Sequence, residues 1–172
     1  MKENLLLYFI SGNFIILTGC LSLGSMNKNI SSTTVLKAEV NPSEVKQGDF
    51  FKVRFNWKAK NPLDDDYSIF VHFVDKDGKT VFQGDHKPPL MLTNLPQWKG
   101  EISYELKFQV PSNLPDGEYE ILVGLYNEKG RLKLNAGRDV IEKSDSRYKV
   151  GILKINPKAK PILPDTTGKK NS

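Results

Sequence analysis

The sequence predicts an all-β domain, built as a single sandwich of about seven or eight short antiparallel strands. Two observations support this prediction. Several segments have the pattern of β-strands and are separated by turn residues, and no window of useful length carries the apolar stripe of an amphipathic helix. The chain of 172 residues, 38% hydrophobic and 26% charged, is long enough for one folded domain and short for two.

The clearest strands alternate apolar and polar side chains. The apolar positions are Phe51, Val53, Phe55 and Trp57 in the first such segment, and Tyr104, Leu106, Phe108 and Val110 in the second. Successive side chains of a strand point to opposite faces of its sheet, so this period of two places one face in a core and the other in water. Both segments are therefore predicted to be half-buried strands.

Two further segments, Tyr67–Val74 and Tyr119–Tyr126, are apolar at nearly every position. Continuous apolar runs rich in β-branched and aromatic residues are typical of central strands. Weaker strand patterns cover Val35–Val40, Thr80–Gln83, Leu132–Leu134 and Tyr148–Ile155. Because glycine supplies the positive φ of tight turns, Asp77-Gly78 and Glu128-Lys129-Gly130 are predicted to close hairpins.

A local motif indicates the kind of sandwich. Pro115-Asp116-Gly117 is a turn signal that leads directly into Tyr119, where a predicted central strand begins. This order resembles the tyrosine corner of immunoglobulin-like folds, in which the phenol bonds to the backbone of the preceding connection. The resemblance implies an immunoglobulin-like β-sandwich and a structural role for Tyr119. Ile121 stands where antibody-type domains keep a cysteine.

A longer series of short motifs follows the order of a known module. The series comprises Phe70–Asp75, Asp77-Gly78, Gln83–His86 with Pro88, Trp98–Gly100, Pro111, Pro115–Tyr119 and Val123–Tyr126. Over residues 67–134 the chain resembles the small β-sandwich module of bacterial dolichyl-phosphate mannosyltransferase-like membrane proteins. That module is an accessory beside a catalytic part. The resemblance therefore implies a non-enzymatic domain that contacts glycans or another envelope protein.

The N-terminus has the pattern of an export signal. Lys2 precedes an apolar stretch, Leu5–Leu17, which is shorter than the roughly 20 residues that a membrane-spanning helix needs. The stretch ends in Leu17-Thr18-Gly19-Cys20, which resembles the lipobox of bacterial lipoproteins. The resemblance implies cleavage between Gly19 and Cys20 and a diacylglyceryl group on the Cys20 thiol, so that membrane lipid is a partner through acylated Cys20. The alternative, an uncleaved anchor with an ordinary cysteine, explains the order of these residues less well.

Four segments are predicted from these patterns. They are a signal peptide at 1–19, a flexible tether at 20–33, the β-sandwich domain at 34–156 and a disordered tail at 157–172. A lipid on Cys20 predicts a location in the cell envelope. Leu21 and Ser22 do not resemble an inner-membrane retention signal. The outer membrane, on its periplasmic face or at the cell surface, is therefore preferred over the inner membrane.

Charge and cysteine content exclude several classes of function. The net charge of +5 is spread along the chain without a dense basic block, so nucleic acid is not an expected partner. Cys20 is the single cysteine, which leaves the folded domain no disulfide and no thiolate metal site. No serine lies in a nucleophile-elbow motif and no glycine-rich phosphate loop opens a helix. No catalytic residues, metal or cofactor are therefore expected.

The remaining polar clusters have a structural and a functional interpretation. His72 and His86, with Asp75 and Asp85 nearby, could bind a metal, but no spacing on one element enforces it and hydrogen-bonded roles are preferred. The Asp64-Asp65-Asp66 turn could hold calcium, yet an exposed turn is the better interpretation. Any two acidic residues could also meet as a glycosidase pair, although the sequence favours no pair.

The segment Asp85–Glu101 is the most prominent connection, because long loops in compact domains are often functional. Trp98, together with Asp85 and His86, forms a candidate ligand surface, since an indole ring can stack on a sugar. The preferred alternative is that the leucines of this loop close the end of the sandwich and Trp98 plugs it. We expect a lipid-anchored cell-envelope protein with a non-enzymatic binding or structural domain. A carbohydrate-binding module is the first alternative, and a small envelope hydrolase is the least favoured.

Overall fold

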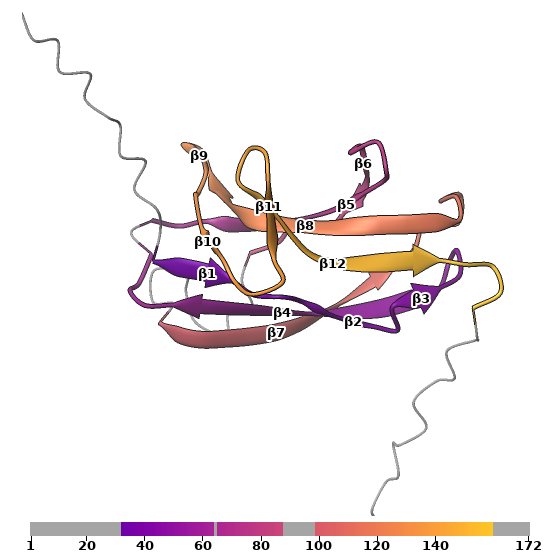
Figure 1. The fold of residues 1–172 in the computed structure, drawn as a ribbon, viewed down its shortest axis with the longest axis horizontal. Coiled ribbons are helices and arrows are strands. Elements are labelled where there is room, and N and C mark those ends of the chain that lie inside the picture. Colours follow the sequence, from indigo (N-terminus) through magenta and orange to yellow (C-terminus); the bar gives the residue numbers. More distant parts are fainter. Residues whose placement is uncertain (1–31, 64, 88–98, 160–172) are drawn as a thin grey trace, which may run out of the picture.

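The structure, a computed structural model, describes residues 32–63, 65–87 and 99–159, and it confirms the predicted all-β sandwich (Figure 1). The described residues form strands and turns and no helix. The strands are β1 (Thr33–Val35), β2 (Glu39–Asn41), β3 (Glu44–Val45), β4 (Phe50–Ala59), β5 (Ser68–Val74), β6 (Thr80–Gln83), β7 (Gly100–Gln109), β8 (Gly117–Asn127), β9 (Gly130–Arg131), β10 (Asn135–Ala136), β11 (Ile141–Lys143) and β12 (Arg147–Ile155).

The strands form two stacked sheets (Figure 1). The first sheet has five strands in the order β10-β1-β4-β2, with β7 on the other side of β4. The second sheet has seven strands in the order β11-β12-β8-β5-β6, to which β3 and β9 are added. Two pairings, β1 with β10 and β3 with β12, are parallel, which corrects the prediction of antiparallel strands throughout. Parallel neighbours need a long crossover, and both pairs join segments far apart in the sequence.

The core lies between the inner faces of the two sheets. In β4, every second residue is buried, as the alternation of apolar residues predicts. The largest side chains of the core are Phe51, Phe55 and Trp57 from the first sheet and Phe73, Ile121, Leu125 and Tyr148 from the second. Complete burial of one such side chain contributes about 1.5–3 kcal/mol relative to its exposure.

Two weak strand predictions fail for identifiable reasons. The predicted strand Val35–Val40 is divided into β1 and β2, because the Ala38 N–H donates to Val150 O of the second sheet and interrupts the ladder with β4. Leu132–Leu134 is not a strand, because both backbone groups of Leu134 bond to the phenol oxygen of Tyr148. The short strands β3 and β11 were not predicted, since two or three residues carry no readable period.

The tyrosine corner is confirmed. The phenol of Tyr119, at the start of β8, donates to Pro115 O at 2.7 Å, and its ring is buried in the core. The predicted Asp77-Gly78 turn is also present. Gly78 has a φ of 79°, and one carboxylate oxygen of Asp75 accepts the N–H groups of Asp77 and Lys79.

Several predictions fall on residues outside the described part of the chain. The signal segment, the lipobox with Cys20, most of the tether, Trp98 and residues 160–172 belong to this group. At the boundaries that are described, β1 begins at Thr33, and a turn after β12 continues to Ala159, whose N–H bonds to Asn156 O. Within the described ranges no helix has the length and apolar character needed to cross a membrane.

Candidate functional site

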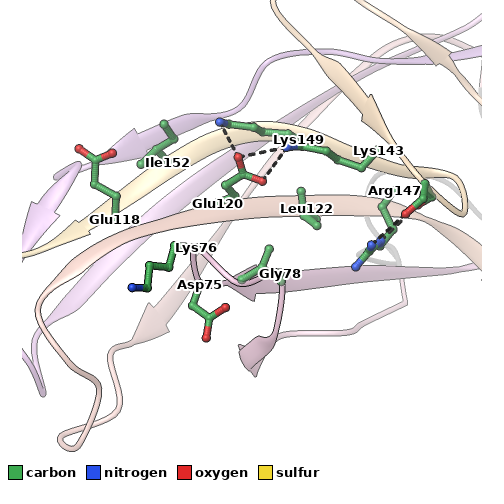
Figure 2. Close-up of a pocket in the computed structure, with 12 residues that line it drawn as sticks. Asp75, Lys76, Gly78, Glu118, Glu120, Leu122, Lys143, Arg147, Lys149 and Ile152 are labelled. Carbon is green, nitrogen blue, oxygen red and sulfur yellow. Dashed lines mark hydrogen bonds and ion pairs between the residues drawn. The ribbon is translucent and has the colours of Figure 1, made fainter.

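A groove of about 410 Å³ lies on the outer face of the second sheet (Figure 2). It crosses β5, β8 and β12 between the β5–β6 turn and the β11–β12 hairpin. The groove combines an apolar floor with charged walls, and it is lined by Val74, Asp75, Lys76, Gly78, Glu118, Glu120, Leu122, Lys143, Ser144, Arg147, Lys149 and Ile152. In the rest of this article, the groove means this set of residues.

Strand register brings these side chains together. Leu122 of β8 pairs with His72 of β5 on one side and with Lys149 of β12 on the other. Glu120 lies between Val74 and Ile152 in the same way. Residues two apart on a strand share a face, so these two rows lie one behind the other on the outside of the sandwich.

Glu120 is the central acid of the groove. One of its carboxylate oxygens lies 2.8 Å from the Lys149 ammonium, and the other lies 3.1 Å from the Lys143 ammonium. Figure 2 shows both lysines joined to the Glu120 carboxylate by dashed lines. Burial raises the pKa of Glu120, but the hydrogen bonds and charges of the two lysines outweigh burial and hold it below the ordinary value. Glu120 is therefore an ionised anchor for two cations.

Arg147 lies at one end of the groove and has a different environment (Figure 2). Its guanidinium donates to the backbone oxygen and the hydroxyl of Ser144, both at 3.2 Å. Among the described residues, no carboxylate lies within 4.0 Å of the guanidinium, whereas Lys143 and Lys149 are both paired. A guanidinium has five N–H donors, so donors remain for a ligand.

A small apolar cluster beneath the hairpin supports the position of Arg147. Phe70, which is 2% exposed although it faces outward, lies against Gly124, where a Cβ atom would come within 2.5 Å of the ring. The same Cβ would lie 2.9 Å from the Ser146 backbone oxygen, so the β11–β12 turn lies directly on the sheet. The Arg131 guanidinium covers the Phe70 ring at 4.8 Å and pairs with Asp145. These contacts hold the β11–β12 turn, which leads into Arg147, against the sheet.

Of the candidate ligand residues from the sequence, Asp85 and His86 lie outside the groove. Trp98 is outside the described residues. The His86 ring is half-buried, with Nδ1 2.8 Å from Gly84 O and Nε2 2.8 Å from the Tyr104 phenol oxygen. Asp85 accepts the Val71 N–H through Oδ1 and lies 3.6 Å from His72 Nε2. A ligand at His86 would have to replace both of its hydrogen bonds, so the contacts of His86 favour a structural role.

The two metal hypotheses find no support in the described part of the chain. There, no group of three or more His, Cys, Asp or Glu side chains is arranged to hold an ion. Asp65 instead pairs with Lys129 at 2.6 Å, and Asp66 pairs with Lys87 at 2.9 Å. These carboxylates belong to exposed ion pairs, which are screened by water and do not mark a metal site.

Both histidines are expected to make the fold less stable in acid. Burial lowers the pKa of His72 and of His86, and it outweighs the opposing effect of Asp85 on both. The folded state therefore favours neutral imidazoles, while the unfolded chain takes up protons as the pH falls below about 6.5. The free energy of unfolding should therefore keep its full value above that pH. It should fall as the pH is lowered from 6.5 to 5, a range in which most carboxylates stay ionised.

Urea denaturation at pH 7.5, 6.5, 5.8 and 5.0 measures this effect. A double variant, His72→Gln with His86→Gln, should show a shallower dependence of the unfolding free energy on pH. An equal slope in the variant and the parent chain would contradict the assignment of the effect to the two histidines.

The groove itself was missed by sequence reasoning. Its signal is present as polar residues on alternate positions of β8, Glu118 and Glu120, but the partners lie on other strands. The pairing of β8 with β12 and β5 decides which charges meet, and periodicity within one strand does not contain that information.

Comparisons with known proteins give no family for the chain: no family profile and no curated protein matches it. One similar solved structure is a Niemann-Pick type C2 protein from Japanese carpenter ant, with 15% identity, a TM-score of 0.46, and coverage of 74% of this chain and 95% of that one. Another is the C-terminal domain of wzt, with 12% identity, a TM-score of 0.49, and coverage of 83% and 84%. At these values neither likeness indicates a function for this chain.

Proposed function

We propose that the protein is a lipid-anchored, non-enzymatic binding protein of the bacterial cell envelope, and that the groove on the second sheet is its ligand surface. The observation that carries the binding function is the combination of an apolar floor with Arg147, whose guanidinium has N–H donors beyond those that bond to Ser144. Ligand sites characteristically join apolar lining with a few placed polar groups. The position at the envelope is supported by the lipobox-like sequence Leu17–Cys20.

The chemistry of the groove supports binding more than hydrolysis. A glycosidase needs one carboxyl group with a raised pKa to act as general acid. Glu120, the central carboxylate, has a lowered pKa because Lys143 and Lys149 bond to it. A carboxylate held ionised by two lysines is a poor proton donor and a good structural anchor.

Hydrogen–deuterium exchange tests the assignment of the surface. The probe is the polysaccharide fraction extracted from envelopes of the producing cells, added to the full chain purified in mild detergent. Bound ligand should slow exchange in peptides from β8 and β12, at residues 117–127 and 147–155, which form the groove. Peptides from β4 and β7 serve as the internal control, because these strands form the opposite sheet. Slower exchange confined to β4 and β7 would contradict our proposal, because it would place the ligand on the first sheet.

A further inference from the structure

The charges of the groove are unevenly distributed. At the β11–β12 end, the cations Lys143, Arg147 and Lys149 face a single carboxylate, that of Glu120. Toward the other end lie Asp75, Lys76 and Glu118, as Figure 2 shows. The positive potential of the groove is therefore concentrated around Arg147, and clustered charge of one sign raises the local concentration of ligands of the opposite sign.

Arg147 is also the cation best prepared to receive an anion. Its Nε and one terminal nitrogen are held by Ser144, which fixes the plane of the guanidinium. The planar guanidinium matches carboxylate and phosphate geometry, and an already positioned fork loses less side-chain entropy when it binds. The β11–β12 turn that carries Ser144 is itself held against Gly124 and Phe70.

The floor of the groove suits the faces of sugar rings, with Leu122 in its middle and Ile152 toward the Glu118 end, away from Arg147 (Figure 2). Leu122 is almost fully buried in the floor, and Ile152 remains 40% exposed next to Glu120. The exposure of Ile152 follows from a register shift between Lys149 and Gly151, which turns Ile152 to the outer face. Apolar carbons of a saccharide can cover the exposed part of Ile152, while its hydroxyls reach Glu118, Asp75 and Ser144 along the walls.

From these observations we infer that the groove binds an acidic saccharide, with Arg147 receiving its carboxylate or phosphate group and Ile152, toward the other end of the groove, supporting the ring of a neighbouring unit. This inference rests on the proposed function, because it names the class of ligand for the same groove. The groove is open to solvent and its lining extends from Glu118 to Arg147 across three strands, which fits a segment of a polymer better than an enclosed small molecule (Figure 2).

Binding by the full chain, purified in mild detergent, tests the inference. Biolayer interferometry measures its affinity for immobilised polygalacturonate, which carries carboxylates, and for phosphomannan, which carries phosphates. Neutral galactan and neutral mannan are the matched uncharged probes. At least one acidic polymer should bind more tightly than its neutral counterpart, and the better acidic probe identifies which anion the site takes.

The variant Arg147→Gln should weaken binding to that acidic polymer about tenfold or more, because a charge-assisted hydrogen bond is lost. Arg138→Gln is the matched control, since Arg138 is exposed, lies outside the groove and carries the same charge. Arg147→Lys keeps the charge but not the fork, and it should give an intermediate affinity. Thermal unfolding of each variant checks the fold. If Arg147→Gln is unfolded, NMR of the parent chain replaces this measurement. The Arg147 Nε–H resonance should then shift when galacturonate is added.

Four outcomes would overturn the inference, and the first three concern the acidic probes and Arg147. They are no binding to either acidic polymer, equal losses in Arg147→Gln and Arg138→Gln, and an Arg147 resonance that does not move. Protection of β8 and β12 by the envelope fraction together with neutral-glycan binding that does not depend on Arg147 would also overturn it. In that last case the proposed binding function would still stand, so the two failures can be told apart.

Discussion

Replacing Tyr148 with phenylalanine is expected to lower the free energy of unfolding by about 2–4 kcal/mol. The Tyr148 phenol accepts the Leu134 N–H at 2.8 Å and donates to the Leu134 carbonyl at 2.9 Å, and both residues are buried. Phenylalanine fills the same space but leaves two buried backbone groups without these bonds. Each unsatisfied buried group costs about 1–3 kcal/mol.

Tyr119→Phe is the matched control for this prediction. It removes one hydrogen bond, to Pro115 O, at an exposed turn where water can replace the phenol. Its expected cost is about 1 kcal/mol. Urea denaturation gives both values by linear extrapolation, provided that the dependence on urea is the same in both variants. Equal losses in the two variants would show that Tyr148 does not hold the Leu132–Leu134 segment.

The strands of the core could be predicted because their information is local. Alternation in β4 and the turn before Tyr119 each depend on residues that are neighbours in the sequence, and the structure confirms both. The failure at Leu132–Leu134 has the opposite cause. Its backbone is satisfied by the side chain of Tyr148, fourteen residues after Leu134, and no local pattern records that bond.

The groove could not be predicted because its geometry depends on register. Even-numbered residues of β12 begin on the inner face, with Tyr148 and Val150 buried. The register shift before Gly151 reverses this phase, so that Leu153 is buried and Ile152 faces outward. A periodic reading of the sequence would place Ile152 in the core. The register shift thus turns Ile152 into the floor of the groove, and this effect is visible only when β12 is paired with β8.

The variant Cys20→Ser is expected to lose all lipid, which is the largest change predicted for this protein. In cells fed an alkyne-bearing fatty acid, the parent chain should carry the label and a mature mass that begins at lipidated Cys20. Two or three acyl chains would anchor it stably, whereas a single chain gives only marginal membrane binding. Because Cys20 is the single cysteine, no other thiol can take the diacylglyceryl group.

Membrane fractionation alone would mislead in this experiment, because an unprocessed chain keeps the apolar stretch Leu5–Leu17 and can remain bound through it. Label and intact mass are therefore the deciding measurements. Cys20→Ser should be unlabelled and should retain residues 1–19, while the control Ser22→Ala, two residues further on, should be labelled and processed like the parent. A parent chain with Met1 present and a freely reactive Cys20 thiol would instead describe an uncleaved anchor. The sandwich domain would then still be held at a membrane, but through a peptide segment and without a lipid.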